Sequence, residues 1–155
     1  NPLFGKVWYA CGDSFTAGGW ASNPPTIGGA SQYKDNIAVY PYYIGARTGC
    51  TVNNIAVSGA TIAQPSDASF NNVFTKPSTG RLYTTNFSDA DYITLYFGIN
   101  DSHHNIPIGT IDDATNETVL GAWNIALDYL TTKYPFSSTA TIAEIIFLTP
   151  ASIEA

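Results

Sequence analysis

Residues 11–19 read Cys-Gly-Asp-Ser-Phe-Thr-Ala-Gly-Gly, and this stretch decides how the rest of the chain is interpreted. The apolar run Val7–Ala10 precedes it and predicts a short buried β-strand. Gly12 ends that strand, and two further glycines close the segment that follows. Ser14 therefore lies where a strand gives way to a turn or to the start of a helix. In an open α/β sheet, ligands bind at the carboxyl ends of the strands, which is where this serine lies.

The Gly-Asp-Ser turn has a structural interpretation and a chemical one. In the structural interpretation, the serine or the aspartate only caps a helix. In the chemical one, the backbone N–H groups of the first helical turn have no intrahelical partner and stabilise a developing negative charge. The tripeptide alone favours the capping interpretation. The residues at the other strand ends are therefore needed to choose between the structural and the chemical interpretation.

The composition indicates one globular domain over residues 1–155 and excludes nucleic acid as a partner. A chain of 155 residues suits one domain with one core. Apolar residues make up 45% and charged residues only 12%, about half the usual share, so the polar surface is mostly uncharged. The net charge of -6 opposes the phosphate contacts that nucleic acids require. No apolar run approaches the ~20 residues of a membrane span.

The two cysteines, Cys11 and Cys50, are predicted to be free thiols and mostly buried. Cys11 lies at the end of the first predicted strand, whereas Cys50 lies just before the next one. If these strands are parallel neighbours, the two sulfurs lie at opposite ends of the sheet, because five strand residues span about 16 Å. A disulfide needs Cα atoms within about 7 Å. Neither Cys-x-x-Cys nor His-x-x-x-His spacing occurs, so we expect no metal site.

The apolar pattern alternates between strands and helices along the chain. Strands are predicted at Val7–Ala10, Thr51–Val57, Asp91–Phe97 and Ile142–Leu148, and helices at Asn36–Thr48 and from about Asn116 to Tyr134. This order predicts an α/β fold with a parallel sheet and helices on both faces. A doubly wound fold usually adds another helix after such a last strand, so we expect the C-terminal part of the domain to be missing.

Three of the four predicted strands end in a glycine-containing segment. The segments are Gly12-Asp13-Ser14, Ser58-Gly59-Ala60 and Gly98-Ile99-Asn100-Asp101. In a parallel sheet these ends share one edge, so a serine hydroxyl, a glycine N–H and an asparagine amide converge there. Acyl transfer needs such a nucleophile and such donors for the developing oxyanion. Gly59 leaves its N–H open to approach, and Asn100 donates without titrating.

These segments resemble the sequence blocks of the SGNH hydrolase family, also called the GDSL family. The blocks are matched, in order, by Gly12-Asp13-Ser14-Phe15, by residues 54–61 and by Gly98-Ile99-Asn100-Asp101, so the resemblance covers essentially the whole chain. It implies a flavodoxin-like three-layer α/β/α sandwich and a serine ester hydrolase that uses no cofactor.

The resemblance also implies a role for each residue of the site. Ser14 would be the nucleophile, and the N–H groups of Ser14 and Gly59 with the side chain of Asn100 would form the oxyanion hole. Asp13 would support the nucleophile turn rather than act in catalysis. The substrate would be a small ester, and the acidic, hydroxyl-rich composition favours an acetylated carbohydrate over a lipid.

The chain departs from the family pattern at the catalytic base. The family carries its base in a late Asp-x-x-His block, and this chain ends before any such block. Its only histidines are His103 and His104, and Asp101 precedes them with that spacing but inside the third segment. We therefore expect the catalytic histidine outside this chain, supplied by a missing C-terminal segment or a second chain. The favoured explanation is a fragment of a longer enzyme; the other is a partial homologue without activity.

Two other classes of protein compete with the enzyme. One is a catalytically inactive module on the same fold that binds carbohydrate or another partner, because ten tyrosines and three tryptophans could stack on sugars. The other is a nucleotide or flavin protein with the same order of layers. That class needs a phosphate-binding loop, and neither Gly-x-x-x-x-Gly-Lys nor Gly-x-Gly-x-x-Gly occurs in the sequence.

Overall fold

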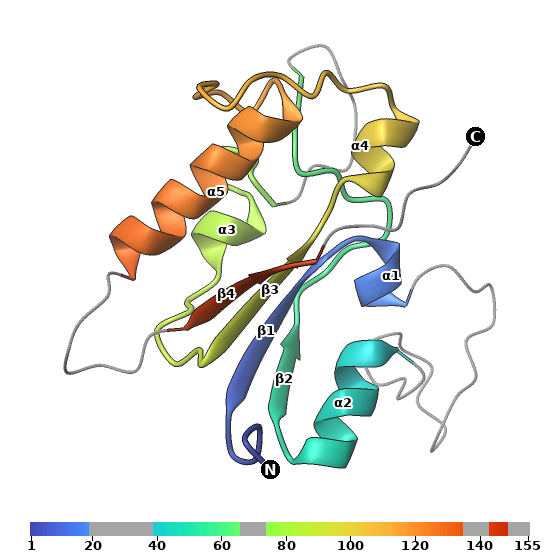
Figure 1. Cartoon of the computed structure of the whole chain (residues 1–155), viewed down its shortest axis with the longest axis vertical. Helices are drawn as coiled ribbons and strands as arrows, with labels where there is room; N and C mark the ends of the chain where they lie inside the picture. Colours follow the sequence, from blue (N-terminus) through green and yellow to red (C-terminus); the bar gives the residue numbers. More distant parts are fainter. Residues whose placement is uncertain (19–38, 66–73, 135–142, 149–155) are drawn as a thin grey trace.

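The computed structural model describes residues 1–18, 39–65, 74–134 and 143–148. Its four strands are β1 (Val7–Gly12), β2 (Thr51–Asn54), β3 (Tyr92–Tyr96) and β4 (Glu144–Phe147). They form one sheet in the order β2-β1-β3-β4, and every neighbouring pair is parallel. Figure 1 shows helices on both sides of this sheet. The predicted α/β fold with a parallel sheet is confirmed.

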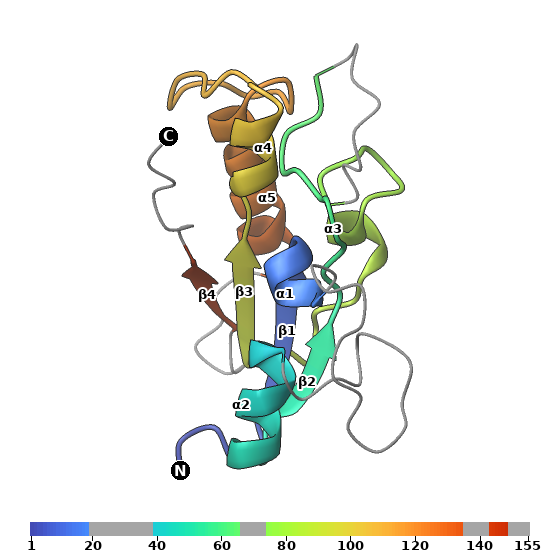
Figure 2. The same cartoon turned by 90° about the vertical axis from the view of Figure 1, so that its right-hand side faces the viewer.

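The helices of the described residues are α1 (Ser14–Ala17), α2 (Tyr40–Thr48), α3 (Arg81–Thr84), α4 (Ile99–His103) and α5 (Val119–Lys133). α2 lies on one side of the sheet, and α3 and α5 lie on the other (Figures 1 and 2). α2 begins at Tyr40 after its N-cap Val39, not at Asn36 as predicted; the predicted residues 36–38 lie outside the described residues. α3 and α4 were not predicted, because helices of four and five residues show no apolar period.

Alternating strand side chains divide the core between the two faces of the sheet. Trp8 and Ala10 of β1 pack on the α2 side with residues of α2 and β2. On the other side, residues of β1, β3, α3 and α5 form a larger cluster, whose buried large members include Leu82, Ile93, Leu95 and Leu130. Central strands of a parallel sheet are buried on both faces, and this explains why they are apolar almost throughout.

Trp8 links three elements on the α2 side. Its indole ring is 7% exposed and lies 6.1 Å from the ring of Tyr40 in α2. The indole N–H donates a hydrogen bond of 2.9 Å to Thr94 Oγ1 in β3. The only polar atom of this buried ring is therefore paired, as buried polar atoms usually are.

Both cysteines are free and buried, as predicted. The pairing of Val7 with Thr51 places Cys50 beside the amino end of β1, whereas Cys11 lies near its carboxyl end. Burial raises the pKa of both thiols, so neither is activated as a nucleophile. In the part of the chain that the structure describes, none of the helices combines the length and the apolar character needed to cross a membrane.

Candidate active site at the carboxyl edge of the sheet

Ser14 occupies the first position of α1, directly after the turn that ends β1. Asp13 caps this helix, because its Oδ1 accepts a hydrogen bond of 2.9 Å from the N–H of Phe15. The helix ends after one turn, where Gly18 adopts a left-handed φ of 80° and donates its N–H to the carbonyl of Ser14. Ser14 is half-buried and therefore remains accessible from solvent.

Gly12 allows this turn to pack closely against β3. A Cβ atom at Gly12 would lie 2.5 Å from Thr16 Oγ1 and 2.8 Å from the carbonyl oxygen of Tyr96. Real Cβ atoms do not approach backbone oxygens this closely. The glycine before Asp13 is thus required by the contact between the turn and the neighbouring strand.

The segment with Gly59 runs beside the end of β1. The N–H of Ile55 donates to the carbonyl of Ala10, and the N–H of Val57 donates to the carbonyl of Gly12, both at 3.0 Å. Gly59 then turns the chain with a φ of 77°, a conformation that strains residues with a Cβ. This segment therefore reaches the same edge of the sheet as the turn that carries Ser14.

A side chain at the end of β2 connects these two segments directly. Asn54 Nδ2 donates a hydrogen bond of 2.7 Å to the carbonyl of Thr16 in α1. Its Oδ1 accepts a hydrogen bond from the N–H of Ala56 at 3.1 Å. Asn54 thus fixes the start of the second segment against the helix that begins with Ser14.

Asn100 brings the third segment to the second. It lies in the first turn of α4, whose N-cap Gly98 has a φ of 122°. Asn100 Nδ2 donates a hydrogen bond of 2.8 Å to the carbonyl of Ala60, the residue after Gly59. An amide nitrogen carries two hydrogens, so this bond to the second segment uses one of the two N–H groups of Asn100.

Asp101 also joins the second and third segments, although the sequence pattern assigns it no role of its own. Its side chain is buried, and its Oδ1 accepts hydrogen bonds from the N–H groups of Ile62 at 3.1 Å and Ala63 at 3.0 Å. Its Oδ2 lies 3.1 Å from the same Ile62 nitrogen. An acidic residue in a first helical turn is a usable signal, but α4 is too short to be predicted from apolar spacing.

Two buried carboxyl groups therefore lie beneath this edge of the sheet. Burial raises the pKa of Asp13 above its ordinary value, and the negative charge of Asp101 raises it further, against the hydrogen bond from Phe15. Burial likewise raises the pKa of Asp101, and its backbone hydrogen bonds oppose that shift. Within the described residues, Asp13 Oδ2 has no hydrogen-bond partner.

The two histidines lie at the C-terminal end of α4. His103 is the last residue of the helix and His104 caps it, and both side chains are exposed. Their rings lie 5.5 Å apart in an edge-to-face arrangement. A positive charge on His104 lowers the pKa of Asp101, but less than burial raises it.

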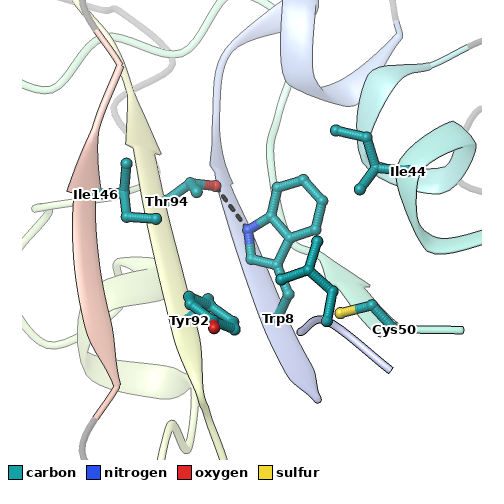
Figure 3. Close-up of a pocket in the computed structure, with 7 residues that line it drawn as sticks. Trp8, Ile44, Cys50, Tyr92, Thr94 and Ile146 are labelled. Atoms are coloured by element: carbon teal, nitrogen blue, oxygen red, sulfur yellow. Dashed lines mark hydrogen bonds between the residues drawn. The ribbon is translucent and has the colours of Figure 1, made fainter. Parts of the chain in front are cut away.

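Two hollows are bordered by α2. One, of about 190 Å³, is lined by Leu3, Trp8, Ile44, Cys50, Tyr92, Thr94 and Ile146, and Figure 3 shows the Trp8 ring between the strands and α2. The other, of about 480 Å³, is lined by Phe15, Tyr40, Tyr96, Phe147 and Leu148, and so reaches the residue after Ser14. Over the described ranges, no three His, Cys, Asp or Glu side chains are grouped to hold a metal ion.

The fold and this edge together define an α/β protein whose parallel sheet presents serine, glycine and asparagine segments at the carboxyl ends of neighbouring strands. The model of the GDSL-like lipase/acylhydrolase family matches residues 10–146, and the chain belongs to this family. The resemblance drawn from the three sequence segments is thereby confirmed. Membership of this family supports a hydrolase of the esterase type.

The chain is also similar to several solved structures. A protein from Lactobacillus plantarum is 23% identical with a TM-score of 0.65, over 97% of this chain and 58% of that one. A Bacteroides ovatus protein described as a GDSL-like lipase is 19% identical with a TM-score of 0.62, over 96% of this chain and 74% of that one. A family two carbohydrate esterase from Clostridium thermocellum, in complex with cellohexaose, is 16% identical with a TM-score of 0.59, over 98% of this chain and 45% of that one.

These similarities establish the fold. They also show that the chain is shorter than the structures it matches. The chain spans 58% of the Lactobacillus plantarum protein and 59% of another matched structure. A comparison with curated proteins gives no match.

Proposed function

We propose that this chain carries the nucleophile and the oxyanion hole of a serine ester hydrolase, with Ser14 as the nucleophile. The observation that carries the proposal is the hydrogen bond from Asn100 to the carbonyl of Ala60. It sets an amide donor beside Gly59, in a segment that itself pairs with the end of β1 through Val57 and Gly12. These two contacts support a site in which donors from two strand ends lie near the serine turn at the third.

In the proposed reaction, Ser14 Oγ attacks the carbonyl carbon of an ester as a base takes its proton. The negative charge then develops on the former carbonyl oxygen. This charge is stabilised by the N–H groups of Ser14 and Gly59 and by the second N–H of Asn100. The base returns the proton to the leaving alcohol, and an acyl-enzyme remains. Water then attacks the acyl group through the same steps and releases the carboxylic acid.

The two backbone donors are available for this role. The N–H of Ser14 belongs to the first turn of α1, where the helix offers it no partner. Among the described residues, the N–H of Gly59 donates no backbone hydrogen bond. Each missing donor should lower turnover by about 10²- to 10³-fold.

The base is proposed to come from polypeptide outside these 155 residues, supplied by a C-terminal segment or a second chain that completes the domain. Two facts support this. His103 and His104 lie at the exposed end of α4, past the residues that brace the second segment. The chain also spans less than two thirds of two structures that it matches. Loss of the base costs on the order of 10⁶ in turnover, so the 155-residue chain alone should be almost inactive.

The proposed substrate is a small ester, with an acetylated carbohydrate favoured over a lipid. The net charge of -6 and the low charged content give an acidic, hydroxyl-rich surface. A second candidate is a sugar-binding module without activity, and it is favoured by the exposed ring of Phe15, which lines the larger hollow together with two tyrosines. Aromatic rings of this kind provide apolar faces on which sugars stack.

Covalent labelling separates these candidates. The full-length protein would be treated with a fluorophosphonate probe and compared with its Ser14→Ala and Ser58→Ala variants. Ser58 is the matched control, because it is an exposed serine in the neighbouring segment. We expect the label on the parent and on Ser58→Ala, and none on Ser14→Ala. Labelling that survives Ser14→Ala, or sugar binding by a protein that does not label, contradicts the proposal.

The location of the base has its own test. The 155-residue chain would be assayed with p-nitrophenyl acetate next to the full-length protein. We expect turnover only from the latter. Robust hydrolysis by the 155-residue chain that is abolished by Ser14→Ala would place the base within these residues.

A further inference from the structure

We propose that Asp101 is a positioning residue of the oxyanion hole, which it serves by locking the segment after Gly59 onto α4. The inference rests on the proposed function, because it concerns the same site. Asp101 itself touches no reacting atom. It acts through the backbone of Ile62 and Ala63, three and four residues after Gly59.

The first argument is the geometry of the contact. Asn100 and Asp101 are consecutive residues of α4, and both side chains hold the same short segment. Asn100 holds the carbonyl of Ala60 at 2.8 Å, and Asp101 holds the N–H groups of Ile62 and Ala63 at 3.0–3.1 Å. One side chain thus fixes an acceptor and the other fixes donors, so side chains of α4 hold three backbone atoms of the segment.

A second contact ties the segment to a residue outside α4. The hydroxyl of Thr75 donates to the carbonyl of Ile62, so this residue is fixed at both its N–H and its C=O. The Thr61 hydroxyl donates to the carbonyl of Ala63 at 2.8 Å. Thr61, Ile62, Ala63 and Thr75 are all buried. Gly59 therefore adjoins a buried stretch that is rigidly tied at several points.

The third argument is energetic. A carboxylate removed from water is costly unless hydrogen bonds compensate for the loss of hydration. Asp101 is 1% exposed, and it accepts hydrogen bonds from the backbone N–H groups of Ile62 and Ala63. Hydrogen bonds to a charged acceptor are about twice as strong as neutral ones. The carboxylate therefore forms stronger hydrogen bonds with the backbone than a neutral side chain would.

The consequence for catalysis is preorganisation. Oxyanion donors act fully only if they already point at the position of the developing charge, and an error of about 1 Å can cost on the order of 10²-fold in rate. Asp101 would hold Gly59 and Asn100 in a fixed relation before the substrate arrives. Its loss should lower kcat while leaving KM nearly unchanged, because the oxyanion forms only during the reaction.

The kinetic test uses the full-length protein with the variants Asp101→Ala and Asp101→Asn. Alanine removes all three contacts, whereas asparagine keeps an acceptor oxygen for Ile62 and Ala63 and places a donor where Oδ2 lay. We expect kcat to fall by about 10²-fold for alanine and less for asparagine, with KM changed less than about twofold. Partial rescue by asparagine distinguishes positioning from a bulk packing effect.

The matched control is Asp113→Ala. Asp113 also braces a loop with three hydrogen bonds, from the N–H and hydroxyl of Thr110 and the hydroxyl of Thr118, but in the loop before α5. The Asp113→Ala substitution should lower the midpoint of thermal unfolding without lowering kcat. If Asp101→Ala folds and retains the parent kcat, or if Asp113→Ala lowers kcat equally, the inference is wrong.

A second measurement does not depend on activity. Amide hydrogen exchange would be followed by NMR at Ile62 and Ala63 in the full-length protein and its Asp101→Asn variant. We expect at least about tenfold faster exchange at these two amides and little change at Leu95 in β3, because only the local contact is weakened. Unchanged exchange overturns the inference. Failure of the proposed function shows itself differently, as activity that survives Ser14→Ala.

Discussion

Replacing Asp13 by asparagine should change how the stability of the protein depends on pH. Asp13 is fully buried, its Oδ1 caps α1, and its Oδ2 has no hydrogen-bond partner within the described residues. Asparagine can keep the cap, because its Oδ1 also accepts the N–H of Phe15 and both residues are good N-caps. The substitution therefore removes the titration while preserving the turn.

The sign follows from the direction of the pKa shift. Burial raises the pKa of Asp13 in the folded protein, so folding favours the protonated carboxyl. The stabilisation is fully present below the unfolded pKa of about 3.9 and is lost as the pH rises through the folded pKa. The free energy of unfolding of the parent, minus that of Asp13→Asn, should therefore rise as the pH falls. One proton limits the slope to about 1.4 kcal/mol per pH unit, and a buried unpaired oxygen sets a total on the order of 1–3 kcal/mol.

Urea unfolding at several values between about pH 3 and pH 7, followed by tryptophan fluorescence, measures this difference. Asp91→Asn is the matched control with the opposite sign. The pKa of Asp91 is lowered by its hydrogen bond and ion pair with Lys6, 2.8 Å away, so its stabilisation is lost as the pH falls. A parent-minus-variant difference for Asp13→Asn that is flat, or that falls with falling pH, would refute the reasoning.

Three further predictions concern the packing of the sheet and of the turn before Ser14. Leu95→Ala in the fully buried centre of β3 should cost about 2–5 kcal/mol in urea unfolding, whereas Phe147→Ala, at a side chain 45% exposed, should cost far less. Gly12→Ala should cost at least about 1–3 kcal/mol by thermal unfolding, because the new methyl group overlaps a backbone oxygen. Trp8→Phe leaves the hydroxyl of Thr94 without its donor and should cost about 1–3 kcal/mol in the same assay, and Thr94→Val on the Trp8→Phe background should recover part of that loss.

The two central strands, β1 and β3, were predictable because their apolar runs reflect burial on both faces of the sheet. The apolar, β-branched run that contains Ile93 and Leu95 predicts a buried strand, and β3 lies within it. The short helices were not predictable in the same way. α4 is set by the positive φ of Gly98 and by contacts of Asn100 and Asp101 with a segment about 40 residues away in the sequence. Such contacts leave no local period in the chain.

For the candidate site too, local spacing predicted some features, whereas features set by tertiary contacts were missed. Spacing after the strands was enough to predict that Ser14, Gly59 and Asn100 lie at carboxyl ends of strands, because parallel strands bring those ends to one edge. The bracing by Asp101 was missed. Which backbone groups meet depends on strand register and on how far each strand continues, and β2 ends at Asn54 although its backbone keeps pairing with β1 beyond that point. Neither the register nor the length of a strand can be read from the residue types alone.

The same kind of bond recurs at each junction of this edge, and the recurrence explains how the site can be rigid while its helices are short. Asn54 holds the carbonyl of Thr16, Asn100 holds that of Ala60, and Asp101 holds the N–H groups beyond it. In each case a polar side chain at one strand end grips the backbone of a neighbouring segment. A one-turn helix such as α1 has almost no cooperative stability of its own, so its position has to come from such links. The apolar clusters beside α2 and α5 stabilise the sheet as a whole, whereas these links orient its edge. The orientation of the site can therefore be lost while the core stays folded.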